Sequence, residues 1–203
     1  MILQTVWLRQ IRIGLPALEF ENWKIGFWVS LKFAQALTAQ VGSLYLVWMS
    51  YTVRVERIIS RPIAVVRRRV APSELSKVVP EACGLVWRTV KAAQVKDAGR
   101  HVAVYRDAGG GLVDIEVGVE VGTAFPGRDE VVGSVLSAGD AATVTHLGPY
   151  RKLGEAHQAI RQWCAVQGRP LAGANWELYG HWLDEWNSDP SKIRTDIFYL
   201  LKS

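Results

Sequence analysis

The chain has 203 residues, of which 49% are hydrophobic and 21% charged, and its formal net charge is +5 at pH 7. This length accommodates one substantial domain with an appendage, and the composition is typical of a folded protein. Only Arg67, Arg68 and Arg69 form a basic cluster, so the sequence lacks the dense basic stripe of a nucleic-acid-binding protein and predicts no direct nucleic acid binding. Cys83 and Cys164 have neither disulfide-framework nor zinc-site spacing, which fits a reducing cytoplasm.

Residues 1–48 differ from the rest of the chain, because they contain four tryptophans and have no repeat partner downstream. Their apolar stretch is interrupted by Lys32, Gln35 and Gln40, whereas a transmembrane helix requires about 20 consecutive, mainly apolar residues. Three interpretations remain open for this helical or disordered extension: a weak membrane anchor, an amphipathic helix lying on the domain, or a mis-assigned start. We favour the third, in which translation begins at Met49.

The first half of the remaining chain predicts five elements. Alternating valines indicate a first strand with one buried face, and a proline turn leads to the second strand. Pro72 and Ser73 start the helical pattern that follows, and Pro80 falls inside it, so two helix starts are open: Pro72, or Pro80 with this proline in the first turn. A glycine-rich turn at 108–111 then joins two strands. The predicted order is strand, strand, helix, strand and strand, at 51–60, 63–70, 72–90, 101–106 and 113–121.

The second half predicts the same order of elements after a linker at 125–129. Gly148 and Pro149 form a turn before the helix, and Gly168 ends that helix. An apolar stripe at helical spacing within it predicts one buried face. The predicted strands and helix occupy 131–136, 141–146, 150–167, 176–182 and 194–201.

The two halves are related by a repeat. Residues 142–153 and 64–75, which lie 78 positions apart (142 − 64), each contain a β-rich run, a turn and a leucine that opens an amphipathic stretch. We therefore predict two similar units, 51–124 and 131–203, each built as strand, helix, strand and strand and packed about a pseudo-twofold axis. The expected fold class is α+β, with a mixed or antiparallel sheet, both helices on one face, and a ligand groove between the repeats.

Several motifs in the second repeat resemble those of the GyrI-like effector-binding domain. They are the run at 146–150, then Leu153, Trp163, the run at 176–179 and the run at 194–197. The resemblance covers about 51–203 and implies that 49–203 is an effector-binding domain whose groove takes hydrophobic, often cationic small molecules. This family includes ligand-binding modules of multidrug-sensing transcription activators and stand-alone gyrase-inhibitory proteins. Because 1–48 contain no helix-turn-helix motif, the chain resembles the bacterial stand-alone members.

The 176–182 strand contains the main candidate for ligand contact, Glu177. Strand alternation places Glu177 and Tyr179 on one side and Trp176 and Leu178 on the other, where we expect Trp176 and Leu178 to form the apolar bed of the helices. The resemblance implies that Glu177 meets the positive charge of the ligand. The alternative is a glutamate at the rim that pairs with Arg194.

The corresponding strand of the first repeat adds a second tyrosine to the predicted groove. Tyr105 is equivalent to Tyr179, whereas Ala103 is equivalent to Glu177. The groove is therefore expected to contain one tyrosine from each repeat and a single carboxylate. This asymmetry offers a cation one place to bind.

Three further aromatic residues are candidate ligand contacts. Tyr150 either packs under the turn or contacts the ligand, and Trp182, which flanks the last hairpin with Trp186, either covers the groove or packs on the surface. Phe198 alternates with Ile197, so one of the two faces the groove. The four histidines share no metal-ligand spacing and no haem-ligand motif is present, so the sequence predicts no metal and no cofactor.

These observations favour a cytoplasmic, non-enzymatic protein that sequesters or senses a hydrophobic, cationic compound, with no membrane association for 49–203. Two alternatives remain. In the first, the protein is a hydrolase that opens strained rings of alkylating compounds, with Glu177 as general base and Tyr179 or Tyr105 as proton donor. In the second, it protects DNA gyrase or partners a transcription regulator, although no residue selects such a partner.

Overall fold

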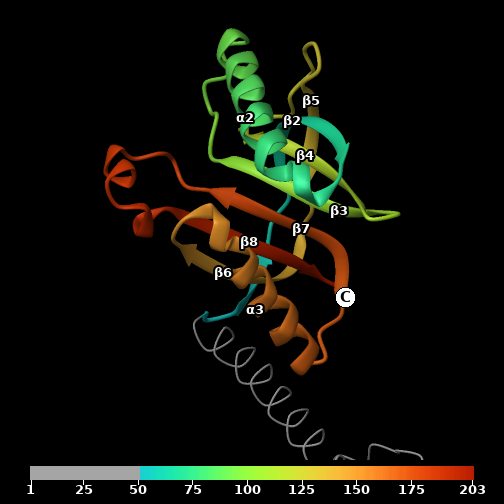
Figure 1. Ribbon diagram of the computed structural model, residues 1–203. Helices are drawn as coiled ribbons and strands as arrows, with labels where there is room; N and C mark the ends of the chain where they lie inside the picture. The colour runs from blue at the N-terminus through green and yellow to red at the C-terminus, as the bar shows by residue number, and fades with distance from the viewer. Residues whose placement is uncertain (1–50) are drawn as a thin grey trace, which may run out of the picture. The chain divides into compact units, whose positions relative to one another are not determined.

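The computed structural model describes residues 51–203, and the predicted extension at 1–48 lies outside the described residues. Eight strands form one sheet, and two helices lie against it (Figure 1). The helices are α2 (Leu75–Ala92) and α3 (Leu153–Val166). The strands are β1 (Arg54–Ile58), β2 (Arg61–Val70), β3 (His101–Gly109), β4 (Leu112–Glu120), β5 (Val132–Leu136), β6 (Gly139–Leu147), β7 (Leu171–Tyr179) and β8 (Arg194–Leu201).

The strand order is β1-β6-β8-β7-β3-β4-β2-β5, and every pairing between these strands is antiparallel. The order is symmetric about the central pair, β3 and β7, one from each repeat. Each repeat contains the four strands predicted along the chain, one more than the strand-helix-strand-strand unit has, and the additional strands β1 and β5 pair with β6 and β2 of the other repeat. The predicted α+β fold with pseudo-twofold symmetry is confirmed.

The positions of β2, β6 and the two helices agree with the 78-residue repeat. Ala64 in β2 lies opposite Val119 of β4, and its counterpart Ala142 in β6 lies opposite Tyr199 of β8. The helices begin 78 residues apart, at Leu75 and Leu153, each after a short 3-10 turn. Residues separated by this interval in β2 and β6, or in the two helices, therefore occupy equivalent places in the two repeats.

Helix α2 begins before Pro80, so the later of the two predicted starts is wrong and the earlier one, at Pro72, is confirmed. The helical segment opens at Pro72, which occupies the first turn of the 3-10 helix Pro72–Glu74. There the Glu74 carboxylate accepts a hydrogen bond of 2.9 Å from the backbone N–H of Ala71. A proline and an acidic residue are favourable at a helix start. Although Pro80 lies inside the helix, burial of Val86 and Val90 against the sheet stabilises the helical conformation.

The two helices cover one face of the sheet, α2 over β2 and β4, and α3 over β6 and β8 (Figure 1). The other face has its own core, in which Trp176 is 2% exposed and stacks on Phe198 with ring centroids 5.3 Å apart. This core also contains Leu178 and side chains from β5 at one edge and β1 at the other. Contact between both edges and the centre requires the sheet to curl around this face. The prediction that Trp176 and Leu178 support the helices is therefore wrong.

Two strands, β1 and β7, also differ from what the sequence predicted. Strand β1 was predicted to have one buried face, yet most of it is exposed because it forms an edge of the sheet. Strand β7 begins at Leu171, earlier than predicted, and ends at Tyr179. Its early part contains an irregularity in the pairing with β8, and Gly173 adopts a φ of 90° there, which a glycine tolerates.

A buried carboxylate joins the two repeats on the helix-free side. Asp196 of β8 accepts hydrogen bonds from Thr145 at 2.7 Å and from Arg194 at 3.1 Å, and it pairs with Arg100 at 2.7 Å. Arg100 precedes β3 in the first repeat and also donates to the backbone carbonyls of Leu178 and Tyr179 in the second. This arginine therefore ties the central strands together.

Acid is expected to weaken this contact. Burial alone raises the pKa of Asp196, but the hydrogen bonds from Thr145, Arg100 and Arg194 outweigh it and lower that pKa below its ordinary value. A carboxyl group whose pKa is lower in the folded state stabilises the fold above the unfolded-state pKa, about 4. That contribution is lost as the pH falls through the lowered value.

Asp196→Asn is expected to reduce the free energy of unfolding by about 2 kcal/mol at pH 7, because it leaves Arg100 without its buried partner. At pH 3 the difference from wild type shrinks, because this pH lies below the unfolded-state pKa of about 4, where part of the stability contributed by the Asp196 charge is lost. Urea unfolding at both pH values measures this, with Asp140→Asn in the exposed pair with Arg57 as control. A loss of equal size at both pH values would contradict the prediction.

Candidate functional site

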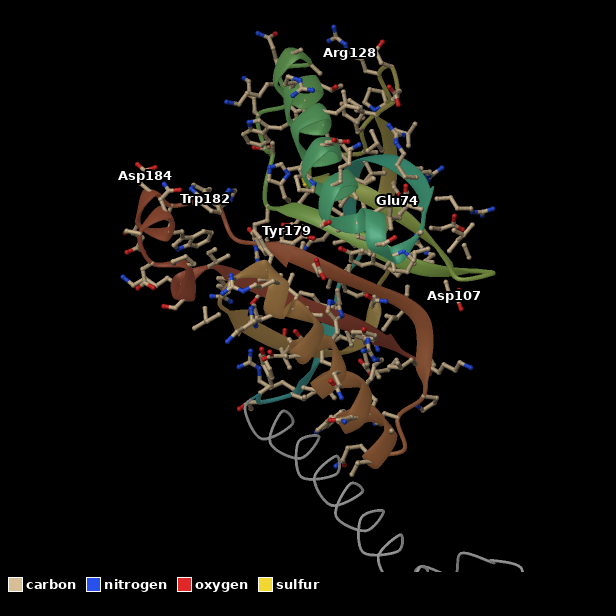
Figure 2. All side chains as sticks on the ribbon, in the orientation of Figure 1. Glu74, Asp107, Arg128, Tyr179, Trp182 and Asp184 are labelled. Carbon is tan, nitrogen blue, oxygen red and sulfur yellow. The ribbon has the colours of Figure 1, made fainter. Side chains whose placement is uncertain are left out.

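A cavity of about 1020 Å³ lies on the helix-covered face, and residues of α2, α3, β3 and β7 line it. Both repeats therefore contribute to its walls. In Figure 2 Tyr179 lies at the end of β7, between the two repeats, and Trp182 lies on the loop that follows. Both residues line the cavity.

Glu177 lies at the base of this cavity and is 5% exposed. It sits opposite Ala103 on the neighbouring strand β3, so that Tyr105 lies diagonally across on β3 and Tyr179 lies two residues further along β7. The phenol hydroxyls of Tyr105 and Tyr179 donate to the same carboxylate oxygen, Oε2, at 3.0 and 2.5 Å. The structure thus brings together the carboxylate and both tyrosines that the sequence analysis paired.

Both phenols remain protonated donors in this setting. Burial raises the pKa of Tyr105 well above its ordinary value, and the negative charge of Glu177 raises it further. Burial likewise raises the pKa of Tyr179 well above its ordinary value, with further contributions from Tyr105 and Glu177. The hydrogen bonds to Glu177 therefore persist across the physiological pH range.

Three residues that the sequence analysis did not select complete the site. His157 of α3 is 2.7 Å from Oε1 of Glu177 through Nε2 and 2.9 Å from the Tyr199 hydroxyl through Nδ1. Arg161 donates to the same hydroxyl at 2.8 Å. The available signals were the i, i+4 spacing of His157 and Arg161 on one helix face, and the two-residue spacing that places Tyr199 on the same side of β8 as Ile197.

Glu177 has no lysine or arginine partner among residues 51–203; His157 is the one basic side chain within ion-pair distance in this part of the chain. Arg194, the alternative partner considered from sequence, pairs with Asp196 instead. A buried carboxylate needs hydrogen bonds or a counter-ion to offset its desolvation. Here Tyr105, Tyr179 and His157 supply the hydrogen bonds.

The two walls of the cavity differ in polarity although the repeats share one architecture. The 78-residue interval relates His157 to Val79 (157 − 78) and Arg161 to Cys83 (161 − 78), and all four residues line the cavity. Burial raises the pKa of the Cys83 thiol to about 11, so this side chain is neutral at pH 7. At these two positions α2 therefore presents an apolar side chain and a neutral thiol to the cavity, whereas α3 presents a histidine and an arginine.

Of the other predicted contacts, Tyr150 and Trp182 line the cavity. Tyr150 packs edge-on against Tyr179, with ring centroids 5.7 Å apart, and Trp182 packs edge-on against Trp186. Both are more than one-third exposed, so they stand at the rim rather than the base.

Phe198 was predicted to contact the ligand, but it lies on the helix-free face against Trp176 and does not line the cavity. The register explains the error, because Glu177 pairs with Ile197 and therefore shares a face with it. Strand alternation then places Tyr199, rather than Phe198, on the cavity side.

Two further features are absent from residues 51–203. No group of three or more His, Cys, Asp or Glu side chains is arranged to hold a metal ion. None of the helices in this part of the chain has the length and hydropathy that crossing a bilayer requires.

No protein-family model matches this chain, and no curated protein matches it in sequence. Solved structures do match it in fold. The C-terminal domain of EcmrR has a TM-score of 0.61 and 21% identity, over 75% of this chain and 98% of that domain. EcmrR in its complex with DNA has a TM-score of 0.61 and 17% identity, over 89% of this chain and 70% of that one.

The structure of SAV2435 bound to tetraphenylphosphonium has a TM-score of 0.56 and 9% identity, over 75% of this chain and 94% of that one. At these identities the likeness establishes the fold alone. It supports the fold that the resemblance to GyrI-like effector-binding domains implied.

Proposed function

We propose that the region 51–203 binds a lipophilic organic cation in the cavity between the repeats and thereby sequesters or senses it. The observation that carries this proposal is the buried Glu177 carboxylate, which accepts three hydrogen bonds but has no arginine or lysine partner in the described part of the chain. A monovalent cation at about 4 Å gains roughly 4 kcal/mol from such a charge at an effective dielectric constant near 20.

The rest of the cavity suits the apolar body of such a ligand. Leu75 and Val79 of α2 and Val113 of β4 line it, and each Å² of apolar surface removed from water contributes about 25 cal/mol. Tyr150 and Trp182 offer aromatic surface at the rim, where a cation can also contact a ring face. The volume is that of a site for a drug-sized molecule. We expect the charge of the ligand to face β7 and its apolar body to face α2.

The comparison structures give this proposal additional support. SAV2435 shares the fold and was solved with tetraphenylphosphonium, a lipophilic cation. The EcmrR complex includes DNA, which suggests a regulatory setting for the fold. The described residues of the present chain select neither DNA gyrase nor a transcription regulator as partner, so the proposal concerns the small molecule.

Binding is favoured over hydrolysis by the hydrogen bonds that Glu177 already accepts. A general base must accept a proton from a positioned water molecule. Because Tyr105 and Tyr179 occupy Oε2 and His157 occupies Oε1, such a water has to compete with donors held in place by the fold. A cation needs no such displacement, since its attraction to the carboxylate requires no free lone pair.

The test is calorimetric titration of the full chain with tetraphenylphosphonium and with triphenylphosphine oxide, a neutral molecule with similar aromatic groups. We expect one phosphonium per chain, and affinity for the cation at least about tenfold higher than for the neutral compound, equivalent to about 1.4 kcal/mol. The cation should also raise the melting temperature of the protein. Equal affinity for both compounds, or no binding of the cation, would refute the proposal.

A further inference from the structure

The hydrogen-bond chain beside Glu177 has a defined direction. A guanidinium group only donates, so the Tyr199 oxygen accepts from Arg161 at 2.8 Å. The Tyr199 hydroxyl proton then needs an acceptor, and Nδ1 of His157 lies 2.9 Å away. Since a carboxylate only accepts, Nε2 of His157 must donate to Oε1 of Glu177 at 2.7 Å.

In this arrangement the imidazole of His157 is uncharged, and both of its nitrogens and the Tyr199 hydroxyl have hydrogen-bond partners. A second proton on Nδ1 would turn that nitrogen from an acceptor into a donor facing Tyr199. The Tyr199 hydroxyl, which is buried, would then accept from both His157 and Arg161, and its own proton would lose its partner. The positive charge of Arg161 also opposes a second cation nearby.

The charge of Glu177 acts in the opposite direction, because it favours a protonated histidine. The titratable and charged groups that face His157 are therefore Glu177 from β7, Tyr199 from β8 and Arg161 from its own helix. Tyr105 and Tyr179 face it indirectly, through the carboxylate that they share. Their two hydrogen bonds already stabilise the negative charge of the carboxylate, so a protonated histidine is not needed to stabilise it.

We infer that Tyr199 and Arg161 are positioning residues that hold His157 in its neutral Nε2–H form, so that the charge of Glu177 stays available to the cation of the ligand. This inference rests on the proposed function. A protonated His157 would form an ion pair with Glu177 and compete with the ligand for its charge. The neutral form instead orients the carboxylate without neutralising it.

The inference predicts that removing one hydroxyl group introduces pH dependence. In wild type, the affinity for tetraphenylphosphonium should change by less than about threefold between pH 8 and 5.5, although a free histidine titrates near 6.5. In Tyr199→Phe, Nδ1 loses its donor and His157 takes up a proton. The affinity of this variant should then fall by at least about tenfold between pH 8 and 5.5, because the proton on His157 competes with the ligand cation for the charge of Glu177.

Two further variants separate this effect from simple damage to the fold. Arg161→Met keeps the Tyr199 hydroxyl but removes the guanidinium group that donates to it, so the hydroxyl no longer has to donate its proton to His157. The affinity of this variant for tetraphenylphosphonium should therefore show the same pH dependence as that of Tyr199→Phe. His157→Gln in the Tyr199→Phe background retains a side-chain amide that can donate to Glu177 but cannot titrate, so the pH dependence should disappear.

The protonation state is read without ligand by ¹⁵N NMR of the imidazole in the full chain. Wild type should show His157 as the neutral Nε2–H tautomer from pH 8 to 5.5, and Tyr199→Phe should show the doubly protonated form at pH 5.5. A doubly protonated His157 in wild type at pH 7, or parallel pH profiles for wild type and Tyr199→Phe, would overturn the inference. If wild type fails to bind the phosphonium at any pH, the proposed function fails, while the NMR result still decides the state of His157.

Discussion

Glu177→Gln is expected to weaken the binding of tetraphenylphosphonium by about 100- to 1000-fold. The amide has nearly the same size as the carboxylate and can still accept hydrogen bonds from Tyr105 and Tyr179, but it has no charge. At about 4 Å and an effective dielectric constant near 20, the lost attraction amounts to roughly 4 kcal/mol, and each 1.4 kcal/mol corresponds to a factor of ten. Calorimetry of wild type and variant at the same ionic strength measures the difference.

Two controls distinguish the local charge from other effects of this substitution. Glu130→Gln makes the same change of net charge at an exposed site paired with Arg68, and should leave the affinity within about twofold, because exposed charges are screened. Triphenylphosphine oxide should bind wild type and Glu177→Gln with similar affinity, since it has no charge to lose. Similar losses in the Glu130 and Glu177 variants would show that Glu177 has no special role.

Gly118→Ala is expected to prevent stable folding. Gly118 lies in β4 between β2 and β3, opposite Val65 and Val102. A Cβ atom added there would lie 1.8 Å from the carbonyl oxygen of Ala64 and 2.8 Å from its carbonyl carbon. Both are backbone atoms in a paired strand, so the clash is relieved only by separating β2 from β4. We expect a loss of more than about 4 kcal/mol, out of the 5–15 kcal/mol that is typical of folded proteins.

The matched control is the same substitution in a helix. At Gly84 in α2, an added Cβ would meet only the end of the flexible Arg88 side chain, at 3.4 Å. Alanine is favoured over glycine inside a helix by about 0.5–1 kcal/mol, so Gly84→Ala should stabilise the protein. Urea unfolding followed by tryptophan fluorescence compares the two variants. Wild-type stability of Gly118→Ala would show that β2 and β4 are not paired as closely as described.

The repeat, the succession of strands and helices in 51–203, and the pairing of Glu177 with two tyrosines were all predictable from sequence. Strand β8 was predicted with its observed bounds, Arg194–Leu201, because its charged and apolar residues follow a clear pattern after a polar loop. The equivalence of Tyr105 and Tyr179 followed from comparing the two repeats. These features depend on neighbours within one strand or on residues at one repeat interval.

The composition of the cavity beyond Glu177 and the tyrosines was less predictable. His157 lies 20 residues from Glu177, and Tyr199 lies 38 residues from Arg161, with no local pattern linking either pair. Phe198 was assigned to the cavity because the register of β8 against β7 was unknown. A shift of one residue in that register exchanges the two faces of a strand.

Alternation along a strand separates Trp176 and Leu178 from Glu177 and Tyr179, since the backbone geometry of a strand turns successive side chains to opposite sides. The local sequence therefore determines which residues share a face. It does not determine which face the helices cover, because curling of the sheet creates a second apolar core that buries Trp176 without any helix. Only the long-range pairing of the eight strands places the helices beside Glu177, and with them the histidine that hydrogen-bonds to its carboxylate.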